Sequence, residues 1–144
     1  MIYKASFNDL IVVAKMANAM WSNHTLEELE QEFSTIIDCE NSVVFIMYIK
    51  DKAIGFAQCQ LRYDYVEGTD SSPVGYLEGI YVKDEYRNKG YAKELLKKCE
   101  KWALKKGCTE FASDCELINN TSLKFHLNMG FQEVNRIICF TKRL

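Results

Sequence analysis

Residues 75–82 have the sequence GYLEGIYV, a run of apolar and aromatic residues that is typical of a buried β-strand. The run is interrupted by one carboxylate, Glu78, which is costly to bury without a partner. A glutamate in a strand is often only a solvent-facing or ion-paired residue, and the pattern alone favours that interpretation. After a turn at residues 84–85, an amphipathic helix is predicted over residues 89–106. A strand that runs into a helix in this way indicates an α/β unit.

The segments around this unit extend the α/β pattern. Before the strand, the sequence predicts two amphipathic helices and a β-hairpin, at residues 6–21, 25–39, 43–49 and 53–63. After the long helix it predicts a strand, a helix and two further strands, at residues 110–114, 120–128, 131–134 and 136–141. We therefore expect an α/β fold with a mixed central sheet flanked by helices, in a single domain over residues 1–144.

The composition limits the functions that such a domain can serve. The net charge is −2, so no general attraction to nucleic acid is expected. The six cysteines include no CxxC pair, and His24 and His126 lie far apart, so we predict reduced core thiols and no metal site. The first residues lack the pattern of a signal peptide, and no apolar run approaches the length of a membrane span. We expect a cytoplasmic protein that does not bind membranes.

Residues 87–92, RNKGYA, lie between the opening strand and the long helix. A turn that contains glycine at a helix N-terminus presents backbone N–H groups and the positive end of the helix dipole, which suits a phosphate. Taken alone, such a turn is more often an exposed helix start. Together with Asn119 and the pair Gly130-Phe131, the turn resembles the GNAT superfamily of acyl-CoA N-acetyltransferases. The resemblance implies a GNAT-type fold.

The same resemblance implies acetyl-CoA as the co-substrate. The main chain of residues 80–82 would pair with the pantetheine arm, and the turn at residues 87–92 would bind the pyrophosphate. The expected acetyl-CoA-binding residues are Ile80, Tyr81, Val82, Arg87, Asn88, Lys89, Gly90, Tyr91, Ala92 and Asn119. For Asn119, a helix N-cap is an alternative role that is compatible with this contact.

Two longer segments, residues 71–82 (SSPVGYLEGIYV) and 108–114 (CTEFASD), resemble the aminoglycoside 6'-N-acetyltransferases, which are antibiotic-resistance enzymes. This resemblance implies direct transfer of acetyl from acetyl-CoA to the 6'-amino group of an aminoglycoside, and it implies a homodimer. The site residues it implies are Glu78 to position and deprotonate the amine, Asp114 to hold neighbouring ammonium groups, and Trp21 and Tyr65 to pack on the sugars.

The chemistry of acyl transfer agrees with such a site. Positioning contributes roughly 7–11 kcal/mol to reactions of this kind, whereas a positioned acid or base contributes about 10²–10⁴-fold, so we expect positioning to dominate. Residues 63–82 contain acidic residues but no lysine, arginine or histidine, so this stretch can attract a polycation. A merely solvated acidic loop is the alternative, and Trp21 and Tyr65 can equally serve ordinary packing.

Two positions depart from the pattern of the relatives. His126 stands where many superfamily members have a tyrosine that protonates the departing thiolate, and we regard it as a weak candidate for that role. Asn135 stands where relatives have a carboxylate that contacts the antibiotic, and Glu133 is the alternative for that contact. The sequence leaves two other functions open. One is acetylation of another small amine, such as a polyamine, or of a protein, and the other is acetyl-CoA binding without catalysis.

Overall fold

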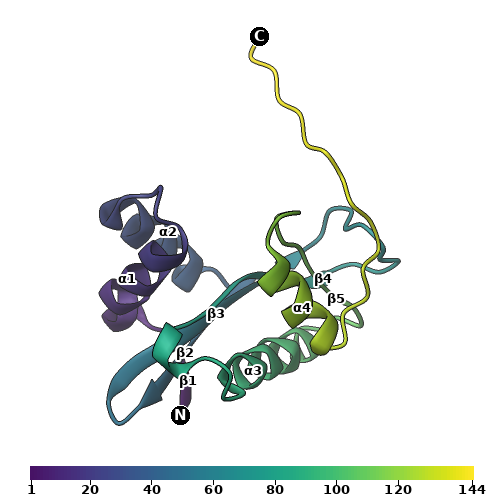
Figure 1. Cartoon of the computed structure of the whole chain (residues 1–144). Helices are drawn as coiled ribbons and strands as arrows, with labels where there is room; N and C mark the ends of the chain where they lie inside the picture. The colour runs from purple at the N-terminus through teal and green to yellow at the C-terminus, as the bar shows by residue number, and fades with distance from the viewer.

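A five-stranded sheet forms the centre of the computed structural model, which describes residues 1–144 (Figure 1). The strands lie side by side in sequence order and are β1 (Ile2–Lys4), β2 (Ser42–Ile49), β3 (Lys52–Arg62), β4 (Val74–Val82) and β5 (Phe111–Ser113). The pairs β1–β2, β2–β3 and β3–β4 are antiparallel, whereas β5 runs parallel to β4. The sheet is therefore mixed, which confirms the predicted fold class.

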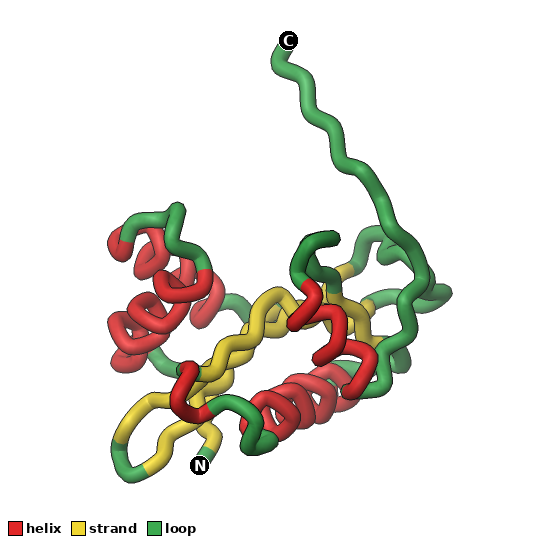
Figure 2. The backbone as a smooth tube through the Cα atoms, in the orientation of Figure 1, coloured by secondary structure: helices red, strands yellow, loops and turns green.

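Four helices cover the two faces of this sheet. They are α1 (Leu10–Met20), α2 (Leu26–Asp38), α3 (Tyr91–Lys105) and α4 (Asn120–Asn128), and short 3-10 turns occur at Phe7–Asp9 and Asp84–Tyr86. Helices α1 and α2 lie on one side of the sheet, and α3 and α4 lie on the other (Figures 1 and 2). The neighbours Val43 and Val44 of β2 belong to different hydrophobic clusters, Val44 to the α1–α2 side and Val43 to the α3 side. Alternation along the strands thus supplies both halves of the core.

The helices begin and bury their faces as their sequences predict. At the start of α2, the Thr25 side chain accepts a hydrogen bond from Glu28 N at 3.2 Å, and the Glu28 carboxylate accepts one from Thr25 N at 3.1 Å. One turn later, Leu29 and Phe33 of the same helix are buried. This i, i+4 pair seats α2 on the core, since residues at that spacing share one face of a helix.

Strand β4 changes its pairing in the middle. Gln58 of β3 pairs with Gly79 while the next residue, Cys59, pairs with Leu77, so Glu78 is an extra residue in a β-bulge. Strand β5 pairs with β4 only from Gly75 to Leu77. The second half of β4, beyond the bulge, therefore has a partner strand on one side only.

The end of the chain differs from its predicted structure. Strands were expected at residues 131–134 and 136–141, and this prediction is wrong, because residues 131–144 contain no helix or strand. The segment leaves the body as an extended tail (Figures 1 and 2). Apart from Phe131, which packs on Phe111, its apolar side chains are exposed, including Ile138 at 81% and Phe140 at 86%. A strand needs a neighbour for its backbone groups, and no other segment of this chain pairs with the tail.

The prediction that the cysteines are core thiols is right for only half of them. Three of the six cysteines lie in the core as expected, Cys59, Cys99 and Cys108, but three others are exposed, Cys39, Cys115 and Cys139. The exposed ones fall after α2, after β5 and in the tail, where no second layer covers the chain. None of the helices combines the length and the apolar character needed to cross a bilayer.

Candidate active site

The bulged residue Glu78 is ion-paired, as the alternative interpretation of a strand glutamate had it, but its partner was not predicted from the sequence. Arg62, the last residue of β3, donates from Nε and Nη2 to Oε1 of Glu78 at 3.0 and 2.8 Å, and from Nη2 to Oε2 at 3.0 Å. The Arg62 guanidinium also lies over the ring of Tyr76, 3.4 Å from its centroid. The acidic stretch was defined from Tyr63 onward, so Arg62 fell one residue outside it. The structure therefore places this cation in the acidic cluster, which is the linked group of Glu78, Arg62, Tyr76 and Asp114.

The second carboxylate, Asp114, follows β5 and is linked to the same cluster. The hydroxyl of Tyr76 donates a hydrogen bond to Oδ2 of Asp114. Burial and this bond raise the pKa of Tyr76, so its hydroxyl stays protonated. Burial also raises the pKa of Glu78, the bonds from Arg62 oppose that rise, and the charge of Asp114 adds to it. Two carboxylates and one guanidinium leave a net negative charge, which suits a cationic amine.

The two aromatic residues predicted to line the site have different surroundings. Trp21, just after α1, packs on Phe33 and Phe56, with ring centroids 6.5 and 6.4 Å away. Its ring also lies against Gly79, where an added Cβ would come within 2.8 Å of it. Trp21 therefore serves core packing and also borders the residue after Glu78. Tyr65, in contrast, is 79% exposed on the loop between β3 and β4.

The turn before α3 has the backbone shape of an anion cradle. Asn88 and Gly90 have φ of 60° and 84°, and Gly90 is the N-cap residue of α3. The side chains of Arg87 and Lys89 are directed at their own chain, with Arg87 Nε donating to Val82 O at 2.8 Å and Lys89 Nζ to Glu85 O at 3.2 Å. Main-chain N–H groups and the positive end of the α3 dipole are thus the groups available to a phosphate there.

Helix α4 begins beside β5 and carries two of the predicted positions. The side chain of Asn119 accepts a hydrogen bond from Ser122 N at 3.1 Å, so Asn119 caps the helix. One ring nitrogen of His126, Nδ1, lies 2.7 Å from Ser122 O and therefore donates to it. The other nitrogen, Nε2, lies 2.8 Å from Oγ of Ser113, the last residue of β5. Sequence reasoning missed Ser113, because no motif distinguishes it from any other strand serine.

A cavity of about 610 Å³ lies between β5, α4 and the first residues of the tail. It brings together Asp114, His126 and Asn135, three positions singled out from the sequence. The Asn135 side chain accepts a bond from Arg136 N at 2.8 Å, while Glu133 forms an ion pair with Arg136. The antibiotic contact that we expect from Asn135 or Glu133 would therefore come from the tail, because neither residue lies on a strand.

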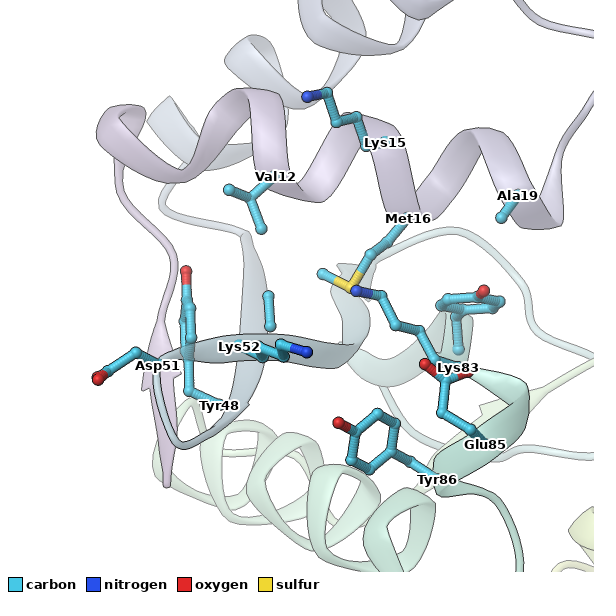
Figure 3. Close-up of a pocket in the computed structure, with 12 residues that line it drawn as sticks. Val12, Lys15, Met16, Ala19, Tyr48, Asp51, Lys52, Lys83, Glu85 and Tyr86 are labelled. Carbon is cyan, nitrogen blue, oxygen red and sulfur yellow. The ribbon is translucent and has the colours of Figure 1, made fainter.

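A second cavity, of about 480 Å³, lies between α1, the β2–β3 turn and the end of β4 (Figure 3). Three lysines line it, Lys15 of α1, Lys52 of β3 and Lys83 just after β4, and Figure 3 shows them on different sides of the space. Tyr81 is the only predicted site residue on its wall, and neither Glu78 nor Asp114 contributes to it. The acidic cluster and this lysine-lined cavity are thus separate features of β4 and its surroundings.

Comparisons with known proteins agree with this geometry. Residues 13–131 match the model of the acetyltransferase (GNAT) family. An aminoglycoside N(6')-acetyltransferase type 1 of Acinetobacter haemolyticus is 36% identical over 141 residues, covering 98% of this chain and 94% of that protein. One of Salmonella typhimurium is 40% identical over 124 residues, covering 86% of each.

Solved structures give the same result. The aminoglycoside N-acetyltransferase AAC(6')-Iy in complex with CoA superposes with a TM-score of 0.97 at 35% identity, covering 100% of this chain and 95% of that one. The same enzyme in complex with a bisubstrate analogue, CoA-S-monomethyl-acetylneamine, gives a TM-score of 0.96 at 35% identity, covering 100% and 98% of the two chains.

Proposed function

The chain belongs to the acetyltransferase (GNAT) family, and we propose that it is an aminoglycoside 6'-N-acetyltransferase that uses acetyl-CoA. It transfers the acetyl group directly to the 6'-amino group of the antibiotic and so confers resistance. The observation that carries this function is the position of Glu78, a carboxylate on a β-bulge where β4 loses its partner β5. A cationic acceptor and an extended thioester can meet at that point of the sheet.

The second half of β4 and the turn after it form the acetyl-CoA side of the site. Beyond Leu77 no strand pairs with β4 on the β5 side, so main-chain groups of Ile80, Tyr81 and Val82 can bind the amides of the pantetheine arm, although the Val82 carbonyl already accepts one hydrogen bond from Arg87 Nε. The turn at residues 87–92 presents its backbone N–H groups to the pyrophosphate. A main-chain N–H near Tyr81 polarises the thioester carbonyl, as in other oxyanion holes.

The acceptor side is formed by the acidic cluster and by aromatic faces. Glu78 accepts the reacting ammonium group and its proton, and Asp114 holds a neighbouring ammonium group. Trp21 and Tyr65 pack on the sugar rings, and Asn135 adds a polar contact from the tail. The short link between Glu78, Arg62, Tyr76 and Asp114 supports this arrangement, because it holds both carboxylates together at the point where β5 ends beside β4.

We further propose a homodimer of single-domain chains, each with residues 1–144 as one acetyltransferase unit. The tail supports the dimer, since Ile137, Ile138 and Phe140 are exposed, and β5 is an edge strand that pairs with β4 alone. A second copy can cover these side chains and pair with that edge. A cytoplasmic location is proposed as well, because all six cysteines are free thiols, which suits a reducing compartment.

Thiol release from acetyl-CoA tests the proposed function directly. Purified protein is offered kanamycin, tobramycin, spermidine and a lysine-containing peptide, each at the same concentration. Rapid release with the two aminoglycosides, and mono-acetylation at the 6'-amine by NMR, is the expected result. Preference for spermidine or the peptide would reassign the acceptor. Tight acetyl-CoA binding without thiol release in any mixture would point to a non-catalytic domain.

A further inference from the structure

Arg62 has no assigned role in acetyl transfer, yet it is the residue most tightly joined to Glu78. Its guanidinium makes three hydrogen bonds to the two oxygens of that carboxylate, at 2.8 to 3.0 Å. The side chains are 37% exposed for Arg62 and 20% exposed for Glu78. The pair is therefore partly shielded from water, where bidentate charge-assisted bonds are stronger than on an open surface.

The ring of Tyr76 holds the Arg62 guanidinium in place. The guanidinium stacks on this ring at 3.4 Å, and the hydroxyl of Tyr76 is fixed by Asp114. Ring and guanidinium thus stack across β3 and β4, and the N–H edge of the guanidinium binds the Glu78 carboxylate. A stacked, planar, bidentate arginine is pre-organised in a way that lysine cannot reproduce.

The same contacts decide which part of the Glu78 carboxylate can meet a substrate. An ionised carboxylate has about four lone-pair directions for hydrogen bonds. Arg62 places two bonds on Oε1 and one on Oε2. The remaining acceptor capacity lies mostly on Oε2, so a single ammonium group has one preferred direction of approach.

We propose that Arg62 is a positioning residue for the acceptor amine, which keeps the Glu78 carboxylate ionised and turned so that Oε2 receives one ammonium group. This role rests on the proposed function of the same site. It explains how a carboxylate that is mostly removed from water, with Asp114 close by, still offers a negative charge to a cation.

The charged groups that act on Glu78 are few. They are Arg62 from β3 and Asp114 beyond β5, and the uncharged titratable neighbours are Tyr76 of β4 and the buried thiol of Cys59 in β3. From α1, the groups that face the adjacent Gly79 are Met20 and Trp21, which carry no charge. Removing the guanidinium therefore leaves burial and Asp114 unopposed, and both raise the pKa of Glu78.

The test compares Arg62→Met and Arg62→Lys with the wild type in kanamycin acetylation. Since Glu78 must be ionised to bind the ammonium group, the acid limb of kcat/KM should move to higher pH in Arg62→Met. At neutral pH the loss should be about 10–100-fold, as expected for a misplaced reacting group, with the KM for acetyl-CoA unchanged. Arg62→Lys keeps the charge without the fork and should fall between the two.

A second readout does not depend on turnover. The carboxyl signal of Glu78, assigned by its disappearance in Glu78→Gln, is titrated by carbon NMR in the wild type and in Arg62→Met. Its midpoint should rise in the variant. Lys97→Met, which removes a positive charge from the exposed face of α3, is the charge control and should leave both readouts unchanged.

The outcomes separate this inference from the proposed function. An unchanged carboxyl midpoint together with an unchanged pH profile in a folded Arg62→Met protein would overturn the role of Arg62. If wild-type protein failed to acetylate kanamycin, the proposed function would be wrong, and the NMR titration would still measure the effect of Arg62 on Glu78. Should Arg62→Met not fold, Arg62→Gln serves the same comparison with a polar side chain.

Discussion

The two halves of β4 have opposite characters. From Val74 to Leu77 the strand is buried, and β5 pairs with it from Gly75 onward, so β3 and β5 enclose it. From Glu78 to Tyr81 the residues are only partly buried, and β3 is the sole neighbouring strand. The division falls at the β-bulge. One strand can therefore anchor the core with one half and offer its backbone and a carboxylate to ligands with the other.

The largest effect should come from the residue at the division. Glu78→Gln keeps the shape of the side chain and one oxygen that can accept from Arg62, but it replaces the second oxygen with an NH₂ donor and removes the base and the charge. We expect turnover with kanamycin to fall by about 10²–10⁴-fold. Steady-state kinetics and equilibrium binding of acetyl-CoA measure the two effects separately. Wild-type turnover in this variant would remove Glu78 from the mechanism.

Truncation in the first half should act on folding instead. Leu77 is 4% exposed and belongs to the cluster beneath α3. Leu77→Ala should lower the free energy of unfolding by about 2–5 kcal/mol, because it leaves a cavity. Urea denaturation measures this loss, and the kcat per folded molecule should stay near the wild-type value. A loss of kcat without a loss of stability would show that the two halves are not separate in function.

A milder effect is expected where the second half touches Trp21. An added Cβ at Gly79 would lie 2.8 Å from the indole, so Gly79→Ala must displace the ring. The KM for kanamycin should rise about tenfold, which corresponds to about 1.4 kcal/mol. A double-mutant cycle with Trp21→Phe provides the control. Additive effects in that cycle would mean that Gly79 acts on the acceptor without Trp21.

The smallest effect should come from the bond between Tyr76 and Asp114. Tyr76→Phe keeps the ring beneath Arg62 and removes only the hydroxyl. The loss of one hydrogen bond, about 1 kcal/mol, should lower kcat/KM only a few-fold. The acid limb of the pH profile should not move, in contrast to Arg62→Met. A large shift of that limb would mean that Tyr76 controls the ionisation of Glu78 as strongly as Arg62 does.

Local patterns in the sequence predicted most of the regular elements. Helix α4 has the predicted bounds, and β4 starts within one residue of its prediction. The three-residue strand β1 was missed, because its only support is pairing with the distant β2. The strands predicted in the tail do have strand-like composition, but they lack a neighbour within the chain. Pairing over long distances is not encoded in local periodicity.

The candidate site was predicted in outline only. Patterns and resemblance singled out Glu78 and Asp114, and the structure brings both to the point where β5 ends beside the bulge of β4. Arg62 could not be predicted to pair with Glu78, since the residues lie on different strands and the β-bulge sets how they meet. The bulge depends on the register between β3 and β4, which no single strand sequence determines.

The one-sided pairing of β4 has a consequence for how long the protein persists in a cell. The unpaired backbone N–H and C=O groups in the second half of β4 gain hydrogen bonds within the complex only when a ligand is bound. Acetyl-CoA should therefore protect the fold against heat and proteases. At a concentration one hundred times its Kd, a ligand that binds only the native state adds about 2.7 kcal/mol to stability. The abundance of this enzyme would then follow the metabolic supply of acetyl groups, and starved cells would lose the protein along with its substrate.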